Sequence, residues 1–192
     1  PPVFDAPVLL AAPRPGWADP ADVPTADVGA RLTYTPGAST VREACVHDPV
    51  HDKYCNPRGR TGLRGRGMLG RYGPNHAADC IVTRHNPRLE RDEVLLVTKH
   101  AGDASALAFP AGMVEPGASV PQTLRAELTE EAVEAGDVVD RLFDECRRGV
   151  VYAGFVDDFR NTDWAWMETT AVHYHATGEV ADGLSLRVTD VA

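Results

Sequence analysis

The sequence predicts an α/β protein, because short apolar runs typical of strands alternate along the chain with helical segments. Strand-like runs stand on both sides of two adjacent helical segments, and clusters of glycine and proline separate the elements. Of the 192 residues, 43% are hydrophobic and 24% are charged, as in ordinary globular proteins. A chain of this length folds as one large domain or two small ones without support from disulfides or metals.

The first 24 residues are rich in proline and predict extended or coil backbone. Seven of the 15 prolines fall in this segment, and proline fixes φ and lacks a backbone donor. The segment Lys53–Ala78 then contains six basic side chains, six glycines and no acidic residue. It is either a flexible solvated linker or a loop whose guanidinium and N–H groups bind phosphate.

Two strands, a loop and a helix are predicted next. Ala78–Arg84 and Glu93–Lys99 are strand-like runs separated by an Asn-Pro breaker. Ala101–Gly117 is interrupted by glycine and proline, and it predicts a loop. Val120–Ala135 predicts a helix.

Asp137–Arg148 predicts a second helix, which ends at two arginines and a glycine. Its apolar stripe consists of Val138, Val139, Leu142, Phe143 and Cys146. Val150–Val156 and Trp166–His175 predict the last two strands. The order strand, strand, helix, helix, strand, strand indicates a mixed α/β layer structure.

The charge and the cysteines exclude several classes of protein. The formal net charge is −9, from 19 basic and 28 acidic residues, which argues against binding of nucleic acid. No apolar run approaches the roughly 18 residues that span a bilayer, so we expect no direct membrane insertion. The four cysteines lack zinc-site spacing and predict reduced thiols in an intracellular protein. Because the chain begins at Pro1, we expect it to be a piece of a longer protein.

Three glutamates form the most informative cluster. Glu127, Glu130 and Glu131 span an arc of about 100° on the predicted helix, so they share one face. No Lys or Arg stands three or four residues from any of them, and like charges at this spacing destabilise a helix by roughly 0.2–0.5 kcal/mol each. The cluster is therefore either a solvated helix face or a site for a hard cation, Mg²⁺ or alternatively Mn²⁺.

The loop before this helix, together with the glutamates, resembles the Nudix box, G-x5-E-x7-R-E-U-x-E-E, in which U is apolar. The matching residues are Gly112, Glu127, Leu128, Glu130 and Glu131. Two positions depart from the pattern, because Ala118 stands in place of a glutamate and Ala126 in place of an arginine. The glycine expected after the glutamates is displaced to Gly136.

Two further segments narrow the resemblance. GRTGLRGRGMLGRYGPNHAA, from Gly59 to Ala78, and VDDFRNTDWAWMET, from Val156 to Thr169, are similar to the ADP-ribose pyrophosphatase branch of the Nudix superfamily. That branch contains free mitochondrial enzymes and the Nudix-homology domains of ADP-ribose-gated melastatin-type TRP cation channels. The resemblance implies a small N-terminal subdomain with its connector over residues 1–73. It implies a Nudix α/β/α sandwich around a mixed sheet over residues 74–192, with a short or truncated C-terminal end.

The resemblance also implies an activity. It is the metal-dependent hydrolysis of the pyrophosphate of ADP-ribose to AMP and ribose 5-phosphate, with Mg²⁺ or Mn²⁺ as the cofactor. We expect an enzyme that is slow, because Ala118 and Ala126 together remove one salt bridge that would orient the metal ligands.

Site residues are carried over position by position. The implied metal ligands are Glu127, Glu130 and Glu131. These three and Asp163 are the implied catalytic residues, with Glu168 as a second candidate for the base. The implied substrate-binding residues are Asn75, His76, Gly112, Met113, Arg160, Asn161 and Asp163.

Each of the carried-over segments has a structural alternative. The loop that contains Arg160 is alternatively an Asx-rich turn, and Asn75 and His76 are alternatively strand caps. We expect Trp164 and Trp166 to pack in the core, with stacking on adenine as the alternative, and His173 and His175 to have a structural or surface role.

A second function remains open. The chain is alternatively a weak or inactive ADP-ribose sensor that partners the rest of a channel subunit on the cytosolic face of a membrane. A free enzyme of this branch would be mitochondrial.

Overall fold

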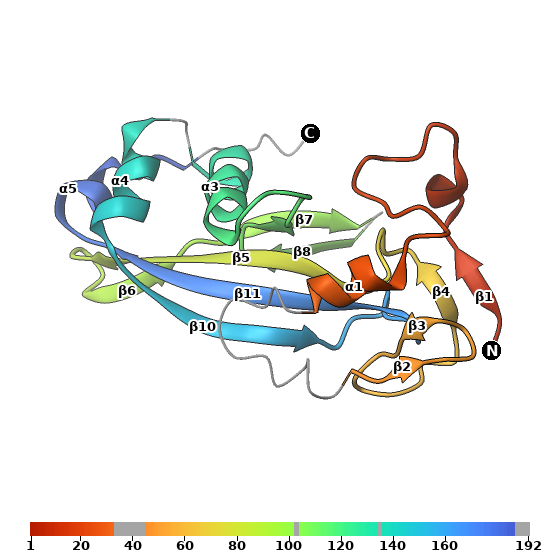
Figure 1. The fold of residues 1–192 in the computed structure, drawn as a ribbon. Coiled ribbons are helices and arrows are strands. Elements are labelled where there is room, and N and C mark those ends of the chain that lie inside the picture. Colours follow the sequence, from red (N-terminus) through yellow and green to blue (C-terminus); the bar gives the residue numbers. More distant parts are fainter. Residues whose placement is uncertain (33–44, 102–103, 134–135, 187–192) are drawn as a thin grey trace. The chain divides into compact units, whose positions relative to one another are not determined.

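The structure is a computed structural model that describes residues 1–32, 45–101, 104–133 and 136–186 (Figure 1). The chain divides into two compact units. The first unit contains Pro1–Ala77 and Ala153–Thr169, and the second contains Ala78–Tyr152 and Thr170–Ala192. The division at residue 73 stays a prediction.

The proline-rich N-terminus of the first unit is partly regular. Strand β1 (Val3–Asp5) pairs in parallel with β4 (Arg64–Gly67), and a 3-10 turn, η1 (Pro7–Leu10), follows. Extended backbone is therefore confirmed at β1, whereas η1 is helical, because proline fits the first turn of a helix. Helix α1 (Thr25–Arg31) comes next. Strands β2 (His47–Asp48) and β3 (Lys53–Tyr54) form an antiparallel hairpin.

The basic segment is not a solvated linker throughout. Arg66 on β4 is buried, and its Nη2 atom lies 2.7 Å from Asp5 Oδ2. The backbone N–H of Arg66 donates to Asp5 Oδ1 at 2.7 Å. Gly65, at φ +94°, leaves no room for a side chain, since an added Cβ would lie 2.3 Å from the carbonyl oxygen of Phe4. These contacts fix the basic segment against β1.

The main sheet contains five strands. Its order is β10 (Arg147–Val156), β11 (Ala165–Ala176), β5 (Gly73–Asn86) and β6 (Arg91–Val94), and β9 (Ala111–Met113) also pairs with β5. Strands β5 and β6 are antiparallel.

Two sequence predictions between residues 93 and 117 are wrong. The single strand Glu93–Lys99 is divided between β6 and β7 (Val97–Ala101). The predicted loop Ala101–Gly117 contains β8 (Ala104–Ala108) and β9. Strand β8 pairs with β7 in a separate hairpin. Backbone pairing with a neighbour stabilises these small-residue strands, and their side chains give no clear alternation by which to recognise them.

Helix α3 (Val120–Glu131) begins at a capping box. Ser119 Oγ accepts from the backbone N–H of Gln122 at 3.4 Å, and Gln122 Oε1 accepts from the backbone N–H of Ser119 at 2.8 Å. The helix ends at Glu131, whereas the predicted end at Ala135 lies outside the described residues.

Helix α4 (Asp137–Glu145) ends before Arg147, which already belongs to β10, so the predicted helix end at Arg148 is wrong. The unpredicted helix α5 (Gly178–Gly183) follows β11.

The core of the second unit explains why one side of its strands carries helices. Alternate residues of β5 and β11 are buried and pack with the apolar faces of α3 and α4. The strand residues of this core include Ala78, Cys80, Val82, Val172 and Tyr174, and the helix residues include Leu124, Leu128, Leu142 and Phe143. In Figure 1, α3, α4 and α5 lie on the same side of these strands. The α/β class is thus confirmed.

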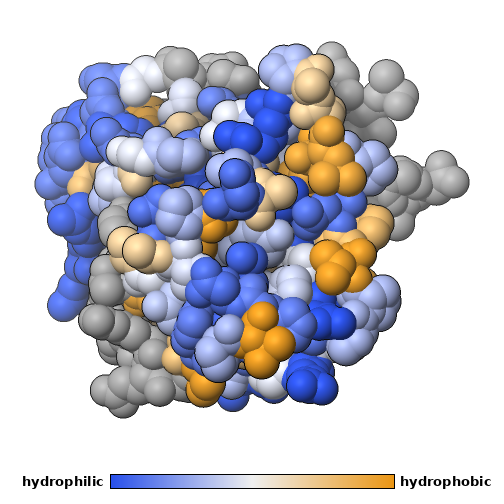
Figure 2. All heavy atoms as spheres, turned by 45° about the vertical axis from the view of Figure 1, so that its right-hand side comes forward, coloured by the Kyte–Doolittle hydropathy of each residue, from blue (hydrophilic) through white to orange (hydrophobic). Residues whose placement is uncertain are grey.

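The surface shows no large apolar area on the face seen in Figure 2, where hydrophobic residues form small groups among hydrophilic ones. Single exposed apolar residues of this kind are ordinary. Among the described helices, none has both the length and the apolar character needed to cross a membrane.

Candidate functional site

The second unit places the glutamates at the C-terminal end of α3, next to β9. A Cβ added to Gly112 would lie 1.7 Å from Glu127 Oε1, so the carboxylate of Glu127 occupies the space beside this glycine. The structure therefore brings together two residues of the box that are 15 positions apart in the sequence. Met113, at the end of the same strand, is 39% exposed.

The cluster has a basic partner that local spacing did not reveal. Lys99 Nζ on β7 forms an ion pair with Glu131 Oε1. Glu131 Oε2 also accepts from the backbone N–H of Ala111 at 3.2 Å. The view of the glutamates as uncompensated is wrong for Glu131, because its partner comes from a different strand.

The three carboxylates influence one another. Burial raises the pKa of Glu127 above its usual range, the charges of Glu131 and Glu130 add to the shift, and Lys99 opposes it. A divalent cation would relieve this repulsion, and carboxylate oxygens are its preferred ligands. Within the described ranges no group of three or more His, Cys, Asp or Glu side chains is arranged so that it could hold a metal ion. The carboxylate oxygens of the cluster suit a divalent cation by their chemistry, and Lys99 engages Glu131 in this structure.

The first unit contains a polar cavity of about 500 Å³. It is lined by the basic segment and by the loop after β10, both of which the sequence analysis singled out, and by Phe155 at the end of β10. The lining residues are Asn56, Arg58, Gly59, Arg60, Thr61, Leu63, Phe155, Asp157, Asp158, Phe159 and Asn161. The volume falls in the range of roughly 300–1,000 Å³ that small-molecule sites occupy.

Asp163 ties these two segments together. Its Oδ1 atom accepts from Thr61 N at 2.7 Å, from Thr61 Oγ1 at 3.1 Å and from Gly62 N at 3.2 Å. Asn56 adds a further tie, because its Nδ2 atom donates to the carbonyl of Thr162 at 3.0 Å. The predicted base Asp163 thus anchors the wall of the cavity.

Arg160 and Asn161 also bind within their own loop. Arg160 makes a bidentate ion pair with Asp158, at 2.8 Å and 2.7 Å. This hydrogen bonding raises the pKa of Arg160 and lowers that of Asp158. Asn161 donates to the carbonyl of Val156 at 2.8 Å and accepts from Met167 N at 2.8 Å. These contacts favour the alternative of an Asx-rich turn.

Asn75 and His76 are buried at the start of β5. Asn75 is 2% exposed and bonds to the backbone of Arg71 and Gly73. Burial lowers the pKa of His76 to about 4, with smaller effects from the charges of Arg71 and Arg31. The capping alternative fits Asn75 better than a substrate contact.

His76 has an acidic neighbour on β11. His76 Nδ1 lies 3.8 Å from Glu168 Oε2, and Glu168 Oε1 accepts from Trp166 Nε1 at 2.9 Å. Burial raises the pKa of Glu168, which is 3% exposed, and the bond from Trp166 opposes the shift. Glu168 and His76 thus face each other inside the first unit.

The remaining aromatic and histidine residues have the structural roles that were expected. Trp164 and Trp166 are buried. His173 and His175 both bond to Thr83 Oγ1, at 2.7 Å and 2.8 Å.

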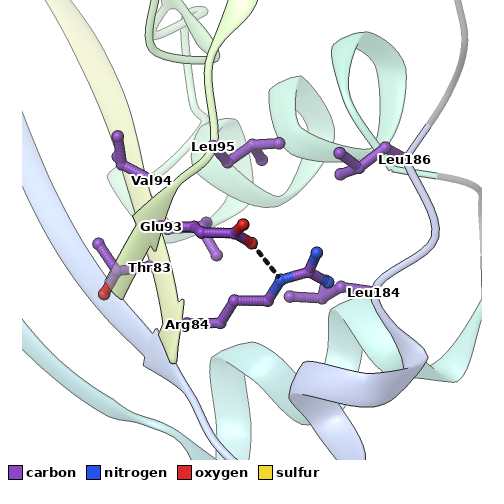
Figure 3. Close-up of a pocket in the computed structure, with 8 residues that line it drawn as sticks. Thr83, Arg84, Glu93, Val94, Leu95, Leu184 and Leu186 are labelled. Atoms are coloured by element: carbon purple, nitrogen blue, oxygen red, sulfur yellow. Dashed lines mark hydrogen bonds and ion pairs between the residues drawn. The ribbon is translucent and has the colours of Figure 1, made fainter. Parts of the chain in front are cut away.

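A second, apolar pocket lies in the second unit (Figure 3). Leu95, Leu184 and Leu186 line it, together with the ion pair between Arg84 and Glu93. Its volume of about 60 Å³ is far below that of a nucleotide site, and none of the predicted site residues lines it.

The sequence of this chain is similar to a known domain family and to several known proteins. Residues 4–73 match the family described as NUDT9-like, N-terminal domain. The chain is 38% identical over 216 residues to the mitochondrial ADP-ribose pyrophosphatase of Rattus norvegicus, an alignment that covers 98% of this chain and 59% of the relative. It is 45% identical over 148 residues to putative nudix hydrolase 6 of Caenorhabditis elegans, covering 76% of this chain and 55% of the relative.

A channel is among the relatives as well. The chain is 38% identical over 213 residues to the transient receptor potential cation channel subfamily M member-like 2 of Nematostella vectensis, covering 98% of this chain and 13% of the channel. Among solved structures, a MutT/nudix family protein from Enterococcus faecalis aligns with 61% of this chain and 40% of its own, at 20% identity and a TM-score of 0.45.

Residues 4–73 thus carry a NUDT9-like N-terminal domain. Along nearly its whole length, the chain is similar to proteins of the ADP-ribose pyrophosphatase branch of the Nudix superfamily. It spans little more than half the length of the two hydrolase relatives and about an eighth of the channel.

Proposed function

We propose that this chain hydrolyses the pyrophosphate of ADP-ribose, with AMP and ribose 5-phosphate as products. The carboxylate cluster on α3 carries the proposal, because Glu127 is packed against Gly112 with a raised pKa and two acidic neighbours. Support comes from the rat relative, which is named an ADP-ribose pyrophosphatase. The reaction needs a group that neutralises two phosphates, and an acidic cluster supplies it only through a cation.

Glu127, Glu130 and Glu131 are the residues that would hold Mg²⁺ or Mn²⁺. A bound divalent ion neutralises phosphate charge and lowers the pKa of a water molecule. Gly112 leaves space for the Glu127 carboxylate, and Lys99 forms an ion pair with Glu131, for which a bound cation would compete. Arg58 and Arg60 line the cavity of the first unit, where their positive charge suits an anionic ligand.

We assign Asp163 a positioning role in this reaction, since three hydrogen bonds to Thr61 and Gly62 already engage its Oδ1 atom. The expectation of slow turnover is kept, because Ala118 and Ala126 remove the residues that would orient the ligands.

The test is AMP release from ADP-ribose in the presence of Mg²⁺. Glu130→Gln should lower the rate by about 100-fold or more with an unchanged melting temperature. Glu115→Gln, an exposed glutamate in the loop before α3, is the matched control and should keep full activity. Full activity of Glu130→Gln would contradict the metal assignment.

The second candidate is an ADP-ribose sensor within a channel subunit, on the cytosolic face of a membrane. Two observations favour it, the channel relative that matches 98% of this chain and the ion pair that occupies Glu131. A free enzyme would instead be mitochondrial, as the rat relative is named. Binding of ADP-ribose without AMP release would support the sensor.

A further inference from the structure

An exposed aromatic ring lies at the cavity of the first unit. Phe159 lines this cavity, yet its side chain is 86% exposed. Leaving a phenyl ring in water forgoes the burial that normally stabilises such a residue. The ring contributes little to packing, and what sets it apart from the other exposed apolar side chains is its place at the cavity, where a flat ligand could stack on it.

A cationic side chain lies beside the Phe159 ring. The guanidinium carbon of Arg160 lies 5.8 Å from the centre of the Phe159 ring. Arg160 itself makes two hydrogen bonds to Asp158. A cation against an aromatic face is favourable.

A second aromatic and cationic pair lines the same cavity. The guanidinium carbon of Arg58 lies 5.5 Å from the centre of the Phe155 ring. The cavity therefore combines two phenyl rings with arginine side chains and with the exposed carboxylate of Asp157. Aromatic rings stack on a base, arginines bind phosphate, and carboxylates accept from ribose hydroxyls.

We infer that the cavity of the first unit binds adenine nucleotides, with Phe159 as the stacking platform for the adenine ring, and so selects adenine-bearing ligands over sugar phosphates. An ADP-ribose molecule has one flat aromatic group, and Phe159 is the exposed ring that this cavity offers to it.

The test compares ligands that contain or lack the base. Titration calorimetry is carried out with ADP-ribose, AMP and ribose 5-phosphate on the unaltered chain and on Phe159→Ala. Because base stacking on an aromatic side chain is worth roughly 1–3 kcal/mol, the Kd for ADP-ribose and AMP should rise by about 5- to 150-fold. The Kd for ribose 5-phosphate should stay unchanged, and Phe159→Trp should restore the affinity for AMP.

Val50→Ala is the matched control, since Val50 is 83% exposed in the same unit and does not line the cavity. An unchanged Kd for ADP-ribose in Phe159→Ala would overturn the inference and leave the proposed function intact. An equal loss for ribose 5-phosphate would also overturn it, because the ring would then act through loop structure. Failure of the unaltered chain to bind ADP-ribose would overturn the proposed function itself.

Discussion

The α3 carboxylate cluster and the cavity of the first unit use charge in opposite ways. In the cluster, burial together with the charges of Glu131 and Glu130 raises the pKa of Glu127. At the cavity, Arg160 and Asp158 neutralise each other, and the carboxylate of Asp163 is committed to backbone donors. Like charges that stand together are open to a cation, whereas charges that are already paired hold the loop in place. The same residue types thus have different surroundings in the two regions.

The largest expected effect comes from filling the space beside Glu127. Gly112→Ala places a methyl group 1.7 Å from the present position of Glu127 Oε1, so the carboxylate must move by an ångström or more. Displacement of this size should lower AMP release by about 100-fold. Gly149→Ala is the control, because an added Cβ there meets nothing within 4 Å. Equal activity of the two variants would show that the position of Glu127 is irrelevant.

The next prediction concerns the cavity wall. Asp163→Ala removes the acceptor of three hydrogen bonds and should lower the free energy of unfolding by about 2–3 kcal/mol. Denaturant titration measures the change. Asp157→Ala, on the same loop but exposed, should change stability by less than about 0.5 kcal/mol. If Asp163→Ala kept full stability and lost only turnover, the catalytic assignment of Asp163 would be preferred over positioning.

His76, which is buried in the first unit, should make the stability of the protein depend on pH. The direction of this dependence is opposite to that expected from Glu127 in the cluster. The folded pKa of His76, about 4, lies below the ordinary 6.5, so its contribution to stability is complete above pH 6.5 and is lost as the pH falls toward 4. The loss should be on the order of 2 kcal/mol by pH 4.5. Unfolding of the unaltered chain and of His76→Asn, measured from pH 7 to 4.5, should show the smaller acid effect in the variant. Parallel curves would contradict the assignment to His76.

Glu127 should change the stability with pH in the direction opposite to that of His76. Its raised pKa means that the folded state binds the proton more tightly, so its contribution is present below the ordinary pKa and is lost as the pH rises through the raised value.

The smallest effect is expected at Lys99. Lys99→Met frees Glu131 and should tighten Mg²⁺ binding by about 3- to 10-fold, because a competing cation is removed. Stability should fall by less than about 1 kcal/mol, since the pair is partly exposed. Calorimetry with MgCl₂ tests this, with Arg88→Met as the control for lost charge. Weaker Mg²⁺ binding in Lys99→Met would mean that the lysine orients the ligand instead of competing for it.

The sequence identified both the α3 carboxylate cluster and the segments that line the cavity of the first unit, but it did not identify the aromatic residues of that cavity. The helix and its glutamate face follow from spacing along the chain, Gly112 was implied by the resemblance to the Nudix box, and the structure has them together. The basic segment and the loop after β10 were also singled out, and they line one cavity. Phe155, within the apolar strand β10, gave no such signal, whereas Phe159 was passed over although an aromatic residue beside an arginine in a polar loop was a usable signal.

What the sequence determined by itself is local. Helical geometry places Glu127, Glu130 and Glu131 on one face whatever surrounds the helix, and the capping residues set where α3 begins. Tertiary structure decided which of these charges are neutralised. Lys99 reaches Glu131 from another strand, and Asp163 receives donors about 100 residues away in the chain. Such pairs depend on packing in space, and spacing along the chain carries no record of them.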